Sequence, residues 1–131
     1  MSIIVSEPQT VIVGRFTADL TQAAGAYDLC TATNGGILIE AWSVYVETAG
    51  ATFTSVKLHT NQTNDTNLVT AVEGAVAGLI AQKVLSLSNP NYPIYLASGQ
   101  KILYTIVGAT GTGSLTVVLR YRPVDGGAVL Q

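Results

Sequence analysis

The chain has 131 residues, enough for one domain, because single hydrophobic cores commonly form at about 100–150 residues. Hydrophobic residues make up 48% of the chain and charged residues only 11%, against about 25% charged in ordinary globular domains. The net charge of −2, with six basic residues that lie mostly apart, excludes the clustered basic surface that nucleic acid binding requires. A surface poor in charge suits a chain that works packed against neighbours; the alternative is an ordinary β domain with a polar, uncharged exterior.

The first residues, MSIIVSEPQT, have neither a basic start nor a long apolar run, so they lack the pattern of a signal peptide. The longest apolar-rich stretch, residues 68–87, is interrupted by Glu73 and Lys83, which argues against a membrane span. Cys30 is the only cysteine, and its apolar, strand-like setting predicts a buried, unreactive thiol. We therefore expect a protein made and assembled in the cytosol, with no membrane partner.

Segments in which apolar residues alternate dominate the rest of the chain. In chain order, strands are expected in TVIVGRF (10–16), AYDLCTAT (26–33), GGILIEAWSVYVET (35–48), TFTSVKLHT (52–60), KVLSLS (83–88), YPIYLA (92–97), KILYTIV (101–107) and LTVVLRYR (115–122). The last two are interpreted as a hairpin, because GATGTG between them supplies residues that adopt positive φ. Pro93 cannot donate to a strand ladder, so its strand should lie at a sheet edge or begin after it. Residues 69–82, small and rich in glycine, are compatible with a short helix or an extended crossing.

Two strands carry the clearest face assignments. In LTVVLRYR, Leu115, Val117, Leu119 and Tyr121 are expected on one face, opposite Thr116, Val118, Arg120 and Arg122. The strand at 37–46 is apolar on both faces, so it is expected either to be sandwiched inside the protein or to have one face in the core and one covered by another subunit. Its two expected rows are Leu38, Trp42, Val44 and Val46, against Ile37, Ile39, Ala41 and Tyr45.

These patterns predict an all-β fold, an antiparallel β-sandwich of about eight strands with little or no helix, and they favour a jelly roll. One domain is expected over residues 1–131, with extended arms at 1–12 and 123–131. For each arm, the alternative is a disordered terminus.

The chain offers little chemistry for catalysis or metal binding. His59 is the only histidine and continues a strand, so it is expected to be a partly exposed strand residue and not a ligand or base. Glu40 and Glu47 are seven positions apart on one strand, which predicts opposite faces and no catalytic carboxylate pair. Trp42 lies among apolar neighbours and is expected in the core. The sequence therefore predicts a protein that is not an enzyme, with no catalytic, cofactor or metal site.

The chain from about residue 26 onward resembles the small β-rich structural proteins of tailed bacteriophages, particularly head decoration or cement proteins. The segments that carry the resemblance are AYDLCTATNGGILIEAWSVYVET, the Asn/Thr-rich loops after it, and YPIYLASGQKILYTIVGATGTGSLTVVLRYRPVDGGAVL. The end of the last segment, RYRPVDGGAVL, is similar to the Tyr-x-Pro-x-Asp/Gly tail of such proteins. The resemblance implies a homodimer or homotrimer on the capsid surface of the virion, where it clamps adjacent subunits of the major capsid protein after assembly in the host cytoplasm.

Interface residues are predicted from position and expected exposure. They are Ile3, Ile4, Val5, Ile37, Ile39, Tyr45, Tyr92, Tyr95, Arg120, Arg122, Val129 and Leu130. Two other functions remain open: a tail-tube, tail-tip or fibre component, and a carbohydrate-binding adhesion module. The adhesion module would stack sugars on the ring of Tyr92 or Tyr95, although their spacing of three predicts opposite sides of a strand.

Overall fold

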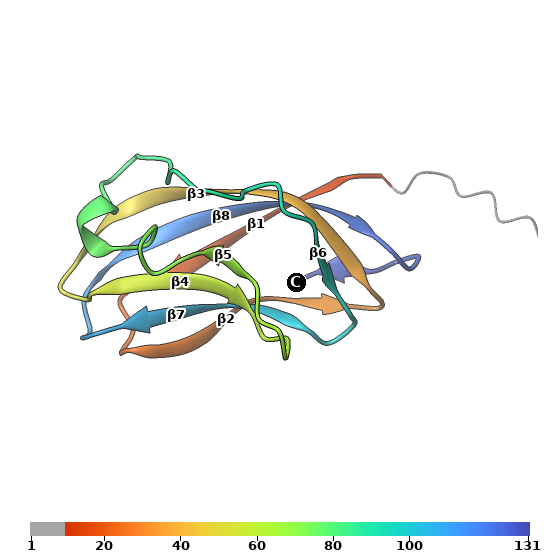
Figure 1. Cartoon of the computed structure of the whole chain (residues 1–131), viewed down its shortest axis with the longest axis horizontal. Coiled ribbons are helices and arrows are strands. Elements are labelled where there is room, and N and C mark those ends of the chain that lie inside the picture. Colours follow the sequence, from red (N-terminus) through yellow and green to blue (C-terminus); the bar gives the residue numbers. More distant parts are fainter. Residues whose placement is uncertain (1–9) are drawn as a thin grey trace, which may run out of the picture.

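A computed structural model describes residues 10–131 as two antiparallel sheets packed face to face (Figure 1). One short 3₁₀ turn, η1 (Val76–Gly78), is the helical part of the described chain. The expected antiparallel β-sandwich with little helix is thus confirmed. The strands are β1 (Ile12–Asp19), β2 (Gly25–Thr33), β3 (Ile37–Ala51), β4 (Ser55–Thr60), β5 (Asn67–Val69), β6 (Ile94–Leu96), β7 (Lys101–Val107), β8 (Thr112–Pro123) and β9 (Val129–Leu130).

The strand order joins early strands to late ones. One sheet has the order β1-β8-β3-β6 and the other β5-β4-β7-β2-β9. The pairs β1–β8, β2–β7, β3–β6 and β4–β5 are all antiparallel. The first four strands therefore pair, in reverse order, with the next four. β7 and β8 lie in different sheets, and the predicted hairpin between them is therefore wrong. Alternation identifies the face of a strand that is buried, but it does not identify the neighbouring strand.

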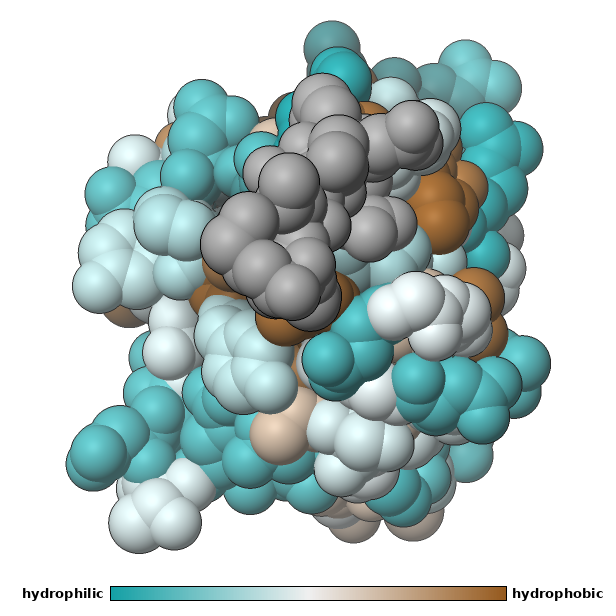
Figure 2. Space-filling model, turned by 90° about the vertical axis from the view of Figure 1, so that its right-hand side faces the viewer, coloured by the Kyte–Doolittle hydropathy of each residue, from teal (hydrophilic) through white to brown (hydrophobic). Residues whose placement is uncertain are grey.

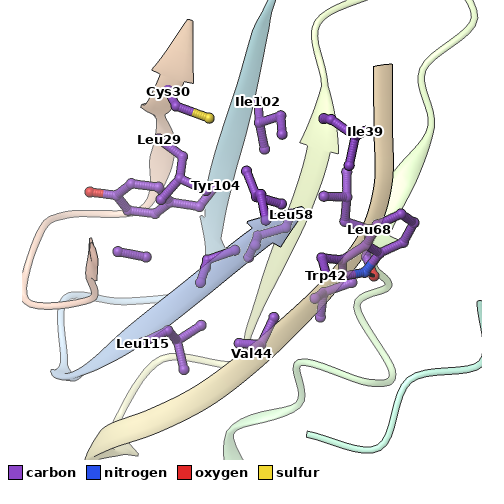
Figure 3. Packing of buried hydrophobic residues seen from close by; sticks show 14 of the residues in the cluster. Leu29, Cys30, Ile39, Trp42, Val44, Leu58, Leu68, Ile102, Tyr104 and Leu115 are labelled. Atoms are coloured by element: carbon purple, nitrogen blue, oxygen red, sulfur yellow. Dashed lines mark hydrogen bonds between the residues drawn. The ribbon is translucent and has the colours of Figure 1, made fainter. Parts of the chain in front are cut away.

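Side chains from both sheets fill a single core, part of which Figure 3 shows. The predicted buried row of β8, from Leu115 to Tyr121, is confirmed, since all four of its side chains are at most 3% exposed. Trp42 on β3 is also buried, as predicted, and its indole Nε1 donates a hydrogen bond to the carbonyl of Leu68 on β5 at 2.9 Å. This bond connects the two sheets and satisfies a polar group that burial would otherwise penalise.

A β-bulge changes the faces of β3. The register against β8 shifts between Ile39 and Ala41, which adds one residue to β3 without a partner. The two predicted alternating rows are therefore wrong, because the bulge reverses the parity of the strand part-way along. The core face of β3 consists of Ile37, Ile39, Trp42, Val44 and Val46.

The chain between β5 and β6, residues 70–93, is named here the crossover segment. It begins with turns that include the short 3₁₀ turn η1 and then runs extended along β3 (Figure 1). The short helix and the extended crossing considered for residues 69–82 therefore each describe part of the segment. Val84 makes only an isolated bridge to Tyr45, and the strand predicted at 83–88 does not form. Five backbone hydrogen bonds attach the segment to β3; donor first, they are Gly50 to Leu79, Gln82 to Val46, Val46 to Lys83, Leu85 to Val44 and Trp42 to Pro90.

The ends of the described chain complete the sheets. β6 begins directly after Pro93 and is the outermost strand of its sheet, as predicted. The extended arm predicted at 123–131 is wrong: β9 pairs with Ala32 and Thr33 of β2, and Ala128 and Leu130 are buried. Of the predicted arm at 1–12, residues 1–9 lie outside the described residues. Within residues 10–131, no helix is long and apolar enough to cross a membrane.

Candidate interaction surface

Cys30 cannot act as a nucleophile in this fold. Its side chain is 2% exposed, and burial raises the pKa of the thiol to about 12, while a hydrogen bond with the backbone of Ile102 opposes this only in part. The thiolate is the reactive form of cysteine, so at neutral pH the group is inert. The predicted burial of the thiol is confirmed, and its raised pKa agrees with the predicted low reactivity.

His59 lies on the outer face of β4, half-buried, as predicted. Its Nδ1 is 2.9 Å from Asp65 Oδ2 and 3.0 Å from the carbonyl of Thr60, and its Nε2 is 2.6 Å from Thr105 Oγ1. Both neighbours of Nδ1 are acceptors, so Nδ1 carries the hydrogen. The sequence did not reveal this chain of groups, because Asp65 lies in a loop and Thr105 is on another strand.

The order of hydroxyl, imidazole and carboxylate is that of a Ser-His-Asp triad, which would also need a substrate site beside the hydroxyl. Acyl transfer needs a concave space and oxyanion donors beside the hydroxyl. Neither of the two surface hollows reported below is lined by Thr105 or His59. The geometry instead fastens the loop between β4 and β5, because Asp65 also accepts a hydrogen bond from Thr60 Oγ1 at 3.1 Å.

Glu40 and Glu47 lie on the same outer face, so the prediction of opposite faces is wrong, again because of the bulges in β3. Glu40 forms an ion pair with Arg122 at 2.7 Å, and Glu47 accepts a hydrogen bond from Thr116 at 2.9 Å. Arg122 and Thr116 are six positions apart on β8, about 20 Å at the rise of a strand. This exceeds the spacing of about 5–10 Å that paired catalytic carboxylates need. Within residues 10–131, no group of three or more His, Cys, Asp or Glu side chains is placed to hold a metal ion.

The predicted interface residues are placed in three different settings. Ile3, Ile4 and Val5 lie outside the described residues. Ile37 and Ile39 are fully buried in the core, and Leu130 is buried in β9 beside the half-buried Val129, so the predicted availability of Ile37, Ile39 and Leu130 to a partner is wrong. At the surface are Tyr45 (half-buried), Tyr92 and Tyr95 (59% and 51% exposed), Arg120 (exposed) and Arg122 (paired with Glu40).

The crossover segment carries an unusual share of the exposed apolar side chains. Of eight large hydrophobic residues exposed in the described chain, four lie in it, and they are named here the crossover surface: Val72 (86% exposed), Ile80 (55%), Val84 (62%) and Tyr92 (59%). Single exposed apolar residues are normal, but here four lie in one segment that has only Glu73 and Lys83 as charges. Sequence patterning missed Ile80 and Val84, because it assigned this stretch partly to a regular strand.

The end of the sandwich that carries the β2–β3, β6–β7 and β8–β9 turns has a different surface. Figure 2 shows polar and neutral residues over most of the part that is drawn in colour, with smaller apolar areas between them. The β2–β3 turn at this end is held by the Asp125 carboxylate, which accepts a hydrogen bond from the Gly36 N–H at 2.8 Å. The visible part of this end is therefore mostly polar or neutral.

Two open hollows adjoin the end of the crossover segment. One, of about 340 Å³, is lined by residues 88–93; the other, of about 280 Å³, is lined by Asp65, Thr66, Asn67, Asn89 and Tyr92. Asn89 and Tyr92 are common to both, so the exposed tyrosine ring stands between them.

No protein-family model and no curated protein matches this chain. Its function is therefore inferred from the chemistry of these surfaces.

Proposed function

We propose that the protein is a non-enzymatic structural protein of a phage virion, which binds the outer surface of the assembled capsid as a homo-oligomer and stabilises it. The observation that supports this most is the crossover surface. Its apolar side chains lie on a segment with two charges, and one of these, Glu73, is engaged by Ser88 through Oγ at 2.8 Å. Such a surface gains free energy when a partner covers it.

The mode of action follows from mass action. A protein that binds only the assembled shell stabilises that shell by its binding free energy and needs no catalysis. The proposed partners are the major capsid protein and further copies of the same chain. Catalysis has no role in this proposal, in keeping with the inert thiol of Cys30 and the separated carboxylates of Glu40 and Glu47.

We also infer that β1 to β8 form a jelly roll. The support is the pairing of β1 with β8, β2 with β7, β3 with β6 and β4 with β5, which places four strands in each sheet. Jelly rolls are common among viral capsid domains, but one fold serves many functions. The fold is therefore compatible with a virion role without deciding it.

The N-terminal residues and the outer edge of β1 are the proposed second contact. Among the described residues, β1 pairs only with β8 and is the outermost strand of its sheet. An outer strand of this kind can accept a strand from another chain. We propose that residues 1–9, with Ile3, Ile4 and Val5, reach a neighbouring subunit or the shell.

The first test is the copy number of the protein in purified particles, measured by quantitative mass spectrometry relative to the major capsid protein. A simple ratio to capsid subunits, with labelled protein seen on the head, supports decoration. A few copies per particle would move the protein to the tail tip or a fibre, and label along the tail would indicate a tail tube. Absence from the particle would contradict any virion role.

A second test uses variants of the surface. The double variant Ile80→Ser with Val84→Ser should lose particle binding, because it removes two apolar side chains from the crossover surface. The control is Val107→Ser, which changes an exposed apolar residue at 42% exposure outside the crossover segment and should bind normally. Equal binding by all three proteins would exclude the crossover surface as the capsid contact.

A further inference from the structure

The two hollows beside Tyr92 form a candidate site that shares Tyr92, but not Val72, Ile80 or Val84, with the crossover surface. They share Asn89 and Tyr92, and together they offer one exposed aromatic ring flanked by amide, hydroxyl and carboxylate groups. Each hollow has a volume near the lower end of small-molecule sites, about 300–1,000 Å³. The site is built from two segments that are far apart in the sequence, residues 65–67 and 88–93.

The first wall of the site, residues 65–67, is held by β4. Asp65 is fixed by His59 at 2.9 Å and by the Thr60 hydroxyl at 3.1 Å, and Thr60 Oγ1 also accepts the backbone N–H of Thr66 at 3.0 Å. The side chain of Asp65 nevertheless remains 44% exposed. A carboxylate has about four acceptor positions, so Asp65 can still accept hydrogen bonds from a ligand while it is held in place.

The second wall is attached to β3 and to the start of the crossover segment. The carbonyl of Pro90 accepts the N–H of Trp42 at 2.9 Å, and the carboxylate of Glu73 holds Ser88 through its backbone N–H at 2.6 Å. Pro90 and Pro93 further restrict the backbone on either side of Tyr92. A site whose walls are fixed before binding loses less conformational entropy when a ligand arrives.

The lining defines the class of ligand. The Asp65 carboxylate can accept hydrogen bonds, and the amides of Asn67, Asn89 and Asn91 can both accept and donate them. The exposed ring of Tyr92 offers an apolar face for a ring-shaped ligand to stack on. Of the described residues that line the hollows, none is a Lys or Arg, so an anionic ligand would meet the Asp65 carboxylate without a compensating cation. These features match a neutral sugar, which has many hydroxyl groups and an apolar ring face.

We propose that the protein binds a neutral carbohydrate in these hollows, with a pyranose ring stacked on Tyr92 and its hydroxyl groups hydrogen-bonded to Asp65, Asn67 and Asn89. Of the crossover surface, the sugar site uses only Tyr92 and leaves Val72, Ile80 and Val84 to the proposed capsid contact. It would allow a protein fixed to a larger particle to hold glycans on a surface that the particle meets. Many weak sites on one particle reach a high combined affinity, because each further contact is intramolecular.

The test is a titration of the full-length, ¹⁵N-labelled protein with glucose, galactose, N-acetylglucosamine and their β-linked disaccharides, observed by NMR. At least one of these sugars should shift the amide signals of residues 65–67 and 88–93. Tyr92→Ala should then weaken binding about tenfold, Tyr92→Phe should retain it, and Asn89→Ala should weaken it several-fold. Tyr95→Ala is the matched control, because Tyr95 is similarly exposed (51% against 59%), lies three positions away and lines neither hollow, and it should bind like the wild type.

Several outcomes would overturn the proposal. Absence of shifts with all the sugars, or an equal loss in Tyr92→Ala and Tyr95→Ala, would exclude a sugar site at Tyr92. If a chelator abolishes the sugar-induced shifts and calcium without sugar shifts the same amide signals, the site binds a cation and not a sugar. Shifts with inorganic phosphate instead of sugars would contradict the requirement for a neutral ligand.

Discussion

The central strand pair β3–β8 and the crossover segment lie side by side, but they are held in different ways. β3 and β8 share a long ladder, and their inward side chains are among the most deeply buried of the protein. The crossover segment is attached to β3 by five backbone hydrogen bonds and to itself by the carboxylate of Glu73. The regular pair provides stability, whereas the irregular segment presents the exposed apolar residues and the hollows. Regions with few buried contacts are where proteins commonly place binding residues.

The largest expected effect is on the regular part. Trp42→Ala should lower the free energy of unfolding by about 3–5 kcal/mol, because it opens a cavity in the core and leaves the Leu68 carbonyl without its donor. Urea denaturation measures this loss, with unfolding monitored by far-UV circular dichroism so that the signal does not depend on Trp42. Trp42→Phe, which keeps most of the volume, should cost clearly less. A loss below about 1 kcal/mol for Trp42→Ala would contradict the central place of this residue in the core.

Two glycines in the crossover segment test how closely it packs. A Cβ added at Gly74 would lie 1.8 Å from the carbonyl oxygen of Val56, whereas nothing lies within 4 Å of one added at Gly78. Gly74→Ala should therefore destabilise the protein by about 1–3 kcal/mol, through displacement of the segment from β4. Gly78→Ala should be neutral or stabilising by about 0.4–1 kcal/mol, because it restricts the unfolded chain. Thermal unfolding of the two variants makes the comparison, and equal effects would contradict the described packing.

A smaller effect concerns pH. Burial alone would raise the pKa of Glu73, but hydrogen bonds from Thr70 and Ser88 outweigh it and lower the pKa below its ordinary value of 4.5. Glu73 therefore stabilises the fold above about pH 4.5, and this contribution is lost as the pH falls through the lowered pKa. Because the carboxylate is only partly buried and solvent screens it, the contribution should be about 0.5 kcal/mol or less.

Unfolding of the wild type and of Glu73→Gln across acid pH isolates this contribution. Hydrogen bonds from Thr21 lower the pKa of Asp19 in the same way, so some acid sensitivity should remain in the variant. The difference between the two proteins should shrink as the pH falls below 4.5. A difference that grows instead would show that the sign of the pKa shift is wrong.

The last prediction is that the Cys30 thiol does not react while the protein is folded. Because burial raises the pKa of Cys30 to about 12, iodoacetamide should not alkylate the folded protein in mildly alkaline buffer and should alkylate it fully in denaturant. Intact-mass measurement detects the adduct. Rapid modification of the folded protein would show that β2, where Cys30 lies, opens easily.

Much of the fold could be predicted because the signal is local. Side chains of a strand alternate between its two faces, so the run from Leu115 to Tyr121 reveals its own buried row. Pro93 likewise indicated the start and the edge position of β6, since a proline has no N–H to donate. The burial of Cys30 and Trp42 followed from their apolar neighbours in the same strands.

The candidate sites were less predictable. Tyr92 was noted as an exposed ring, but Asp65 and Asn89, which stand beside it in the hollows, are separated by more than twenty positions in the chain. The contact between His59, Asp65 and Thr105 depends on the pairing of β4 with β7 and on one loop. Neither arrangement leaves a periodic pattern, so no spacing in the sequence pointed to it.

The sequence by itself determined that this chain forms strands, which of their faces are apolar, and that it has little ionisable chemistry, because residue type and period are properties of each segment. Only the tertiary structure decided that β7 and β8 belong to opposite sheets, that a bulge brings Ile37 and Ile39 into the core, and that the C-terminal residues pair with β2. Those choices depend on which distant segments compete for the same edge or the same space in the core. Their free energies come from long-range packing and hydrogen bonding, which no single segment contains.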